Sequence, residues 1–82
     1  MSVHCYQLVD KDVIPDDCTE FNCYLQRLTK LPNLPQSLVE LYCYDNKLTE
    51  LPELPNKLYV INCANNPIQY ITKHNYEIIK KY

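Results

Sequence analysis

The most reactive side chains in this 82-residue sequence are five cysteines, a number that invites a disulfide or a zinc site. Three of them, Cys23, Cys43 and Cys63, recur at intervals of 20 residues. This column predicts a line of buried small hydrophobic side chains, because a straight ladder lacks the tetrahedral arrangement that zinc requires. Side chains of one parallel column also point the same way, which disfavours disulfide bonds between neighbours. We therefore expect structural free thiols, no metal site and no cofactor.

A second set of reactive residues lies near the N-terminus, where His4 and Cys5 could be a general base and a nucleophile. Adjacent residues on a strand point to opposite sides, however, and no third group is evident to orient them. Cys18 falls in a leucine column and is expected in the core, whereas the role of Cys5 stays open. The sequence has no glycine, which excludes glycine-rich phosphate loops. We predict that the protein has no catalytic residues and is not an enzyme.

The cysteines belong to a 20-residue unit that is written about three and a half times along the chain. Residues 38–55 read LVELYCYDNKLTELPELP, and most of their apolar columns recur 20 residues earlier and later. Val3 and Leu8 align with the columns of Cys23 and Leu28, which extends the pattern to the start of the chain. The apolar columns are Cys18/Leu38/Leu58, Phe21/Leu41/Ile61, Cys23/Cys43/Cys63, Leu28/Leu48/Ile68 and Leu31/Leu51/Ile71.

This periodicity predicts one domain over residues 1–82. Its expected parts are a degenerate half-unit at 1–17, units at 18–37, 38–57 and 58–71, and a C-terminal cap at 72–82. A single unit cannot bury its own leucines, so the units must stack into one continuous core.

The pattern LxxLxCxxNxL followed by TxLPxLP resembles the leucine-rich-repeat family, and more narrowly its short, proline-bearing type from bacteria and from viruses that infect microbes. The resemblance implies a repeat solenoid with a short parallel β-sheet on its concave face and an extended, polyproline-like convex side. It also implies that the amides of Asn46 and Asn66 bond the backbone of neighbouring turns, with Gln26 as a weaker substitute. The residues that carry the match are Leu38, Leu41, Cys43, Asn46, Leu48, Leu51, Pro52, Leu54 and Pro55.

Local physics favours the same fold. Alternation of period two around Leu41 and Cys43 predicts a strand with these two side chains inward and their neighbours outward. Pro52 and Pro55 lack an N–H and disfavour the α region at the preceding residue, so we expect residues 49–57 to be extended. Because the chain has no glycine, turns with positive φ must fall to asparagine or aspartate, or be avoided.

The last eleven residues, 72–82, depart from the unit and predict a short helix that covers the open end of the core. Either Thr72 or Asn75 could serve as its N-cap, and His74 is expected to be part of the cap rather than a ligand. Lys80 and Lys81 suit the C-terminus of a helix. The residues expected on the inner face are Ile71, Asn75, Ile78, Ile79 and Tyr82.

The overall charge narrows the possible partners. A net charge of -2 and a pI near 5.5 argue against nucleic acid, since such proteins usually present a basic face. No apolar run approaches the roughly 20 residues needed to span a bilayer, and the first residues have no features of a secretory signal. We expect a cytoplasmic protein with no membrane contact, inside a host cell if its source is viral or effector-like.

The outward positions of the strands predict the binding surface. Tyrosine is a favoured interface anchor, because it combines contact area with a hydroxyl group at little entropy cost, although it also simply suits an exposed strand. We predict a non-enzymatic protein- or peptide-interaction module that uses this face. The alternative is a structural protein that self-assembles into a homo-oligomer through its exposed terminal strand or its concave face. The predicted partner-binding residues are Glu20, Tyr24, Glu40, Tyr42, Tyr44 and Asp45.

Overall fold

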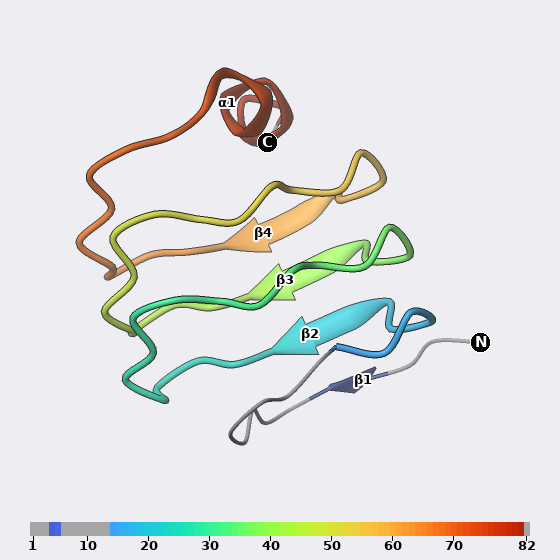
Figure 1. The fold of residues 1–82 in the computed structure, drawn as a ribbon, viewed down its shortest axis with the longest axis horizontal. Helices are drawn as coiled ribbons and strands as arrows, with labels where there is room; N and C mark the ends of the chain where they lie inside the picture. The colour runs from blue at the N-terminus through green and yellow to red at the C-terminus, as the bar shows by residue number, and fades with distance from the viewer. Residues whose placement is uncertain (1–3, 6–13, 82) are drawn as a thin grey trace.

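The computed structural model describes residues 4–5 and 14–81, which form one small parallel sheet followed by a short helix (Figure 1). The four strands lie side by side in chain order, and each connection returns outside the sheet without a helix. The predicted sheet and C-terminal helix are therefore confirmed. The elements are β1 (His4–Cys5), β2 (Glu20–Asn22), β3 (Glu40–Tyr42), β4 (Val60–Asn62) and α1 (Lys73–Ile79).

The register of the sheet follows the 20-residue spacing of the sequence. Phe21 pairs with Leu41 and Leu41 with Ile61, so each column of like residues becomes a line across the strands. The ladder extends beyond the strands, because the N–H of Cys23 donates to the carbonyl of Tyr42 at 2.8 Å. Residues that share a column therefore lie on neighbouring strands and face the same side of the sheet.

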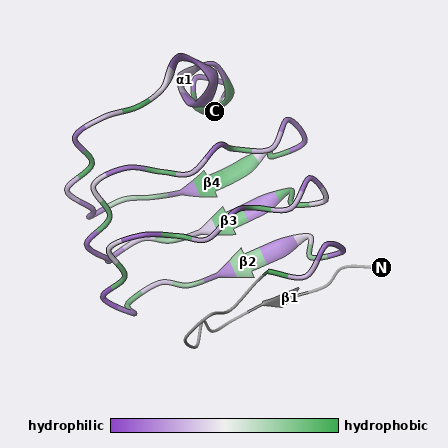
Figure 2. Cartoon of the chain, in the orientation of Figure 1, coloured by the Kyte–Doolittle hydropathy of each residue, from purple (hydrophilic) through white to green (hydrophobic). Residues whose placement is uncertain are grey.

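Each strand is preceded by a tight turn with a hydrophilic tip (Figure 2). The N–H of Leu38 donates to the carbonyl of Pro35 at 3.2 Å, and the N–H of Leu58 bonds that of Pro55 in the same way. Residues 50–55 are extended, as expected for a segment in which two prolines resist the α region.

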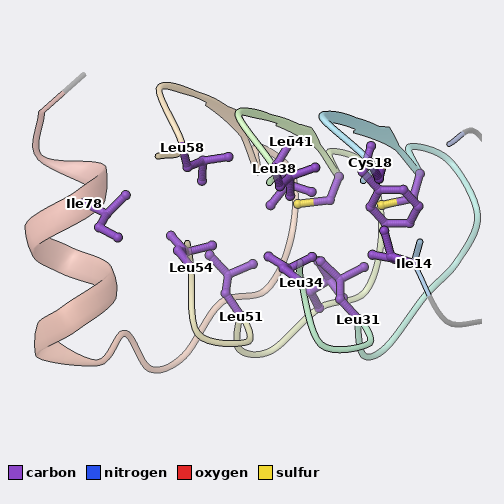
Figure 3. Close-up of a cluster of buried hydrophobic side chains, with 14 residues drawn as sticks. Ile14, Cys18, Leu31, Leu34, Leu38, Leu41, Leu51, Leu54, Leu58 and Ile78 are labelled. Atoms are coloured by element: carbon purple, nitrogen blue, oxygen red, sulfur yellow. The ribbon is translucent and has the colours of Figure 1, made fainter. Parts of the chain in front are cut away.

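The core lies between the sheet and the returning connections (Figure 3). Leucines of the strand side, such as Leu38 and Leu41, face leucines of the connections, such as Leu34 and Leu54. The predicted inward columns are buried in the first two complete turns, where Cys18, Cys23 and Cys43 are fully enclosed.

Two polar residues, Asn46 and Asn66, connect the turns. Asn46 is buried, and its amide spans two turns: Oδ1 accepts hydrogen bonds and Nδ2 donates them. Asn66 repeats this with Leu48 N–H and the carbonyls of Cys43, Cys63 and Ala64. The backbone bonding expected from the resemblance is thus confirmed for both amides. The partners of Asn46 are the N–H groups of Gln26 and Leu28, both at 3.0 Å, and the carbonyls of Cys23 at 2.9 Å, Cys43 at 3.0 Å and Tyr44 at 3.3 Å.

The register at the N-terminus differs from the predicted one. His4 pairs with Glu20 and Cys5 with Phe21, a spacing of 16 residues, whereas the sequence alignment placed His4 in line with Tyr24. The first turn is thus four residues shorter than the later ones, which simple 20-residue counting does not detect. Val3 and Leu8, which the alignment placed in apolar columns, lie outside the described residues.

The last turn is less well buried than the expected columns imply. Ile61, Cys63 and Ile68 are only partly buried, and Ile71, predicted to face inward, is 44% exposed. The physical reason is that a residue of the terminal turn has a neighbouring turn on one side only. The chain also leaves the path of the earlier turns after Gln69, whose N–H still bonds the carbonyl of Thr49 at 2.8 Å.

Helix α1 closes this end of the core, as predicted. Thr72 is the N-cap, and its hydroxyl accepts the N–H of Asn75 at 3.1 Å. Ile78 points from the helix into the core (Figure 3). Lys80 is the C-cap residue.

The polar groups of α1 bind the backbone of the preceding connection. Asn75 is almost fully buried; its Oδ1 accepts the N–H of Leu54 at 2.8 Å and its Nδ2 donates to the carbonyl of Pro52 at 2.9 Å. The Nε2 of His74 lies 2.7 Å from the carbonyl of Leu54, so this nitrogen carries a proton and donates. Asn75, which interrupts the apolar helical face in the sequence, is therefore a structural bond rather than an N-cap.

We expect Asn46→Ala to lower the free energy of unfolding by about 3 kcal/mol, because it leaves backbone groups of two buried turns without partners. Urea denaturation followed by circular dichroism measures this loss. Asn33→Ala is the matched control, since Asn33 is exposed and its removal should change the stability by less than about 0.5 kcal/mol. Equal stability of the two variants would contradict this role of Asn46.

Candidate functional site

The face of the sheet opposite the core contains the predicted binding residues. Alternation places the side chains of positions 20, 22 and 24, and their counterparts on the next two strands, on this outward face. Of these nine positions, two carry a carboxylate and none carries a lysine or arginine. We call this set the outward face; it consists of Glu20, Asn22, Tyr24, Glu40, Tyr42, Tyr44, Val60, Asn62 and Ala64.

Tyr24 and Tyr44 form an aromatic stack on this face. Their ring centroids are 4.8 Å apart and the ring planes differ by 1°. This separation matches the spacing of neighbouring strands, so the stack runs across the sheet from β2 towards β4. Tyr24 is 43% exposed and Tyr44 is half-buried. The structure therefore brings together two of the three predicted tyrosine anchors.

Glu20 and Glu40 are directly opposite each other on β2 and β3. Like charges in this arrangement repel, and each carboxylate accepts a hydrogen bond within its own strand. The Nδ2 of Asn22 donates to Oε2 of Glu20 at 2.9 Å, and the hydroxyl of Tyr42 donates to Oε1 of Glu40 at 2.7 Å. These bonds hold both carboxylates at the outward face.

The bond to Glu40 determines the ionisation of Tyr42. It raises the pKa of Tyr42 from 10.0 to about 12, with smaller contributions from desolvation and from nearby Glu20 and Tyr59. Tyr42 is thus engaged with Glu40 rather than with the aromatic stack, and the three predicted tyrosines do not form one cluster. The influence of Tyr59 indicates that this exposed residue, which was not predicted, lies near Tyr42.

Asp45, the last predicted residue, lies at the end of the strand region next to Tyr44. Its backbone is left-handed, with φ of 58°, and its Oδ1 accepts a hydrogen bond from Nδ2 of Asn65 at 2.7 Å. Asn65 has the same backbone conformation, with φ of 57°. Both residues tolerate this region, as expected for a chain that has no glycine at its turns.

Leu25 is the residue of this site that sequence reasoning missed. It occupies the same column as Asp45 and Asn65 and has φ of 59°, although a leucine is disfavoured there by about 1–2 kcal/mol. Its side chain is 68% exposed next to Tyr24. The available signal was an apolar residue in a column that is otherwise polar. A strained and exposed leucine beside an aromatic residue extends the apolar part of the surface.

The cysteines are placed as structural residues. Burial raises the pKa of the Cys23 thiol to about 12 and also raises the pKa values of Cys43 and Cys63. These thiols are therefore protonated and poor nucleophiles. Cys18, Cys23, Cys43 and Cys63 are all free, and Cys63 is only partly buried, unlike the fully buried position expected for it.

Other kinds of site find no support among residues 4–5 and 14–81. That part of the chain contains no group of three or more histidine, cysteine or acidic side chains that could hold a metal ion. It also contains no helix long and apolar enough to cross a membrane.

Comparisons with protein-family models, with curated proteins and with solved structures found no match. The function must therefore be argued from the outward face itself.

We expect Glu40→Gln to lower the pKa of Tyr42 from about 12 towards 10, because the variant removes the negative charge that favours the protonated hydroxyl. The raised pKa means that this bond stabilises the fold fully below pH 10 and that its contribution is lost as the pH rises through about 12. NMR titration of tyrosine ring carbons measures the shift. Glu50→Gln, at an exposed position outside the strands, is the control and should leave Tyr42 unchanged.

Proposed function

We propose that the protein is a member of the leucine-rich-repeat family, a short solenoid whose units stack their strands into a concave face. Its support is the 20-residue sequence unit, the matching parallel register and the amide bonds of Asn46 and Asn66 between turns. In this proposal the connections form the convex side and α1 covers the last turn.

We further propose that the protein is a non-enzymatic interaction module that binds a protein or peptide through the outward face. The observation that carries this proposal is the exposed Tyr24–Tyr44 stack, which offers a rigid aromatic surface beside carboxylates that already have fixed orientations. Aromatic residues held in place lose little entropy when a partner covers them, which favours binding. The face is small, so a single contact is expected to be weak.

A photo-crosslinking amino acid in place of Tyr44 tests this proposal in cells of the native source. We expect specific adducts from position 44 and none from the same substitution at Tyr70, which is 63% exposed but lies outside the sheet. Replacement of both Tyr24 and Tyr44 by serine should weaken binding of a captured partner at least about tenfold. The matched control, Tyr70→Ser with Tyr76→Ser, removes two exposed tyrosines elsewhere and should leave the affinity unchanged. Equal adduct patterns at positions 44 and 70 would refute the proposed face.

A second candidate function, self-assembly through a terminal strand, is favoured by the edge at β4. This strand is last in the sheet order, and Ile61, Cys63 and Ile68 of its turn are only partly buried. Ile71 adds an exposed apolar side chain to the same turn. A second copy could cover this end.

Sedimentation equilibrium over a range of concentrations tests self-assembly. If the β4 end is the contact, the wild-type chain associates, and Ile71→Lys shifts it towards monomer because a charge enters an apolar interface. Thr29→Lys adds the same charge at an exposed position of an earlier turn and should have no effect. A wild-type protein that remains monomeric at the highest concentration excludes this function.

A further inference from the structure

The aromatic stack ends in an open position on β4. Positions 24, 44 and 64 form one column across the sheet, and the column holds two tyrosines followed by an alanine. One face of the Tyr44 ring is covered by Tyr24 at 4.8 Å. Because the rings are parallel and separated by the strand spacing, the other face of Tyr44 is directed towards the Ala64 position. Ala64 is exposed and supplies only a methyl group, so no side chain of its own column continues the stack.

The rim of this position carries negative charge. Asp45 and Asn65 follow Tyr44 and Ala64 in the chain and are joined by a hydrogen bond of 2.7 Å from Asn65 Nδ2 to Asp45 Oδ1. This bond fixes the carboxylate of Asp45 beside the open end of the stack. The outward face of β2, β3 and β4 supplies no lysine or arginine to neutralise it, and Glu40 adds to the negative potential.

The chemistry that suits this position is a planar cation. A guanidinium group stacks flat on an aromatic ring and at the same time donates hydrogen bonds to a carboxylate in its plane. An ammonium group carries the same charge but cannot stack, and a neutral planar group can stack but gains nothing from the carboxylate.

Resting on the proposed function of the outward face, we propose that this face recognises an arginine in an extended segment of its partner, with the guanidinium stacked on Tyr44 above Ala64 and paired with Asp45. The arginine becomes the third layer of the Tyr24–Tyr44 stack. Its aliphatic stem lies over the Ala64 methyl group, and the strand to which it belongs runs across the outward face.

The probe for this proposal is a capped seven-residue serine/threonine peptide with one central arginine, titrated into the full chain and followed by NMR. Millimolar affinity is expected for a single contact of this kind. The expected signature is a set of intermolecular NOEs from the arginine δ-protons to the Ala64 methyl group and the Tyr44 ring. Matched peptides with lysine or with citrulline, a neutral planar isostere, should bind about fivefold more weakly.

Two variants test the position of the guanidinium. Ala64→Leu fills the open position and should abolish the arginine preference, whereas Ala64→Ser keeps it small and should preserve binding. Asp45→Asn keeps an amino acid that tolerates positive φ and removes the charge, so it should weaken the arginine peptide about fivefold and leave the citrulline peptide unchanged. Circular dichroism of each variant verifies that the fold is retained.

Equal affinities for the arginine and citrulline peptides, unchanged binding to Ala64→Leu, or the absence of saturable shifts at millimolar peptide would each overturn the arginine proposal. None of these results affects the crosslinking test at Tyr44, so the proposed binding face stands or fails separately. Conversely, arginine binding with no crosslinked partner would support the recognition chemistry and contradict the proposed function.

Discussion

The structure depends on amide side chains that satisfy the backbone where the chain turns. Each turn leaves the sheet without a helix, so N–H and C=O groups near the core have no regular ladder to bond with. Asn46 and Asn66 supply both a donor and an acceptor from one rigid group and bind two successive turns at once. No buried side-chain polar atom among the described residues is left without a partner. The leucine core provides the driving force, and these amides determine how one turn is placed on the next.

The outward face follows from that placement. The Tyr24–Tyr44 stack forms because the register keeps equivalent residues one strand apart, which is also a good stacking distance for rings. The left-handed residues just after the strands, including Asp45, turn the chain at the same point in each turn. A surface built in this way has its aromatic and acidic groups oriented before any partner arrives, which reduces the entropy cost of binding.

The sequence predicted the sheet, its register in the middle of the chain, most of the core and the C-terminal helix, because these depend on short periods that are visible in the residues. It failed at both ends, where that periodicity no longer decides. The four-residue shortening before β2 changes no residue type, so counting alone placed His4 wrongly. Ile71 fits its column by type but is exposed, since burial depends on a following turn. At the candidate site, the outward positions could be read from alternation. The stack of two tyrosines, the bond from Tyr42 to Glu40 and the strain at Leu25 could not, because each depends on side-chain conformation or on φ.

Helix α1 holds the last connection mainly through backbone atoms: Asn75 bonds Leu54 and Pro52, and His74 bonds Leu54, all at peptide groups. A terminal element that recognises peptide groups does not require particular side chains in the turn it covers. Whole 20-residue units could therefore be gained or lost ahead of the helix by recombination within the gene, while the same ending continues to fit. The length of such a protein, and with it the area of its outward face, is then free to vary between related genes without the need to evolve a new terminus each time.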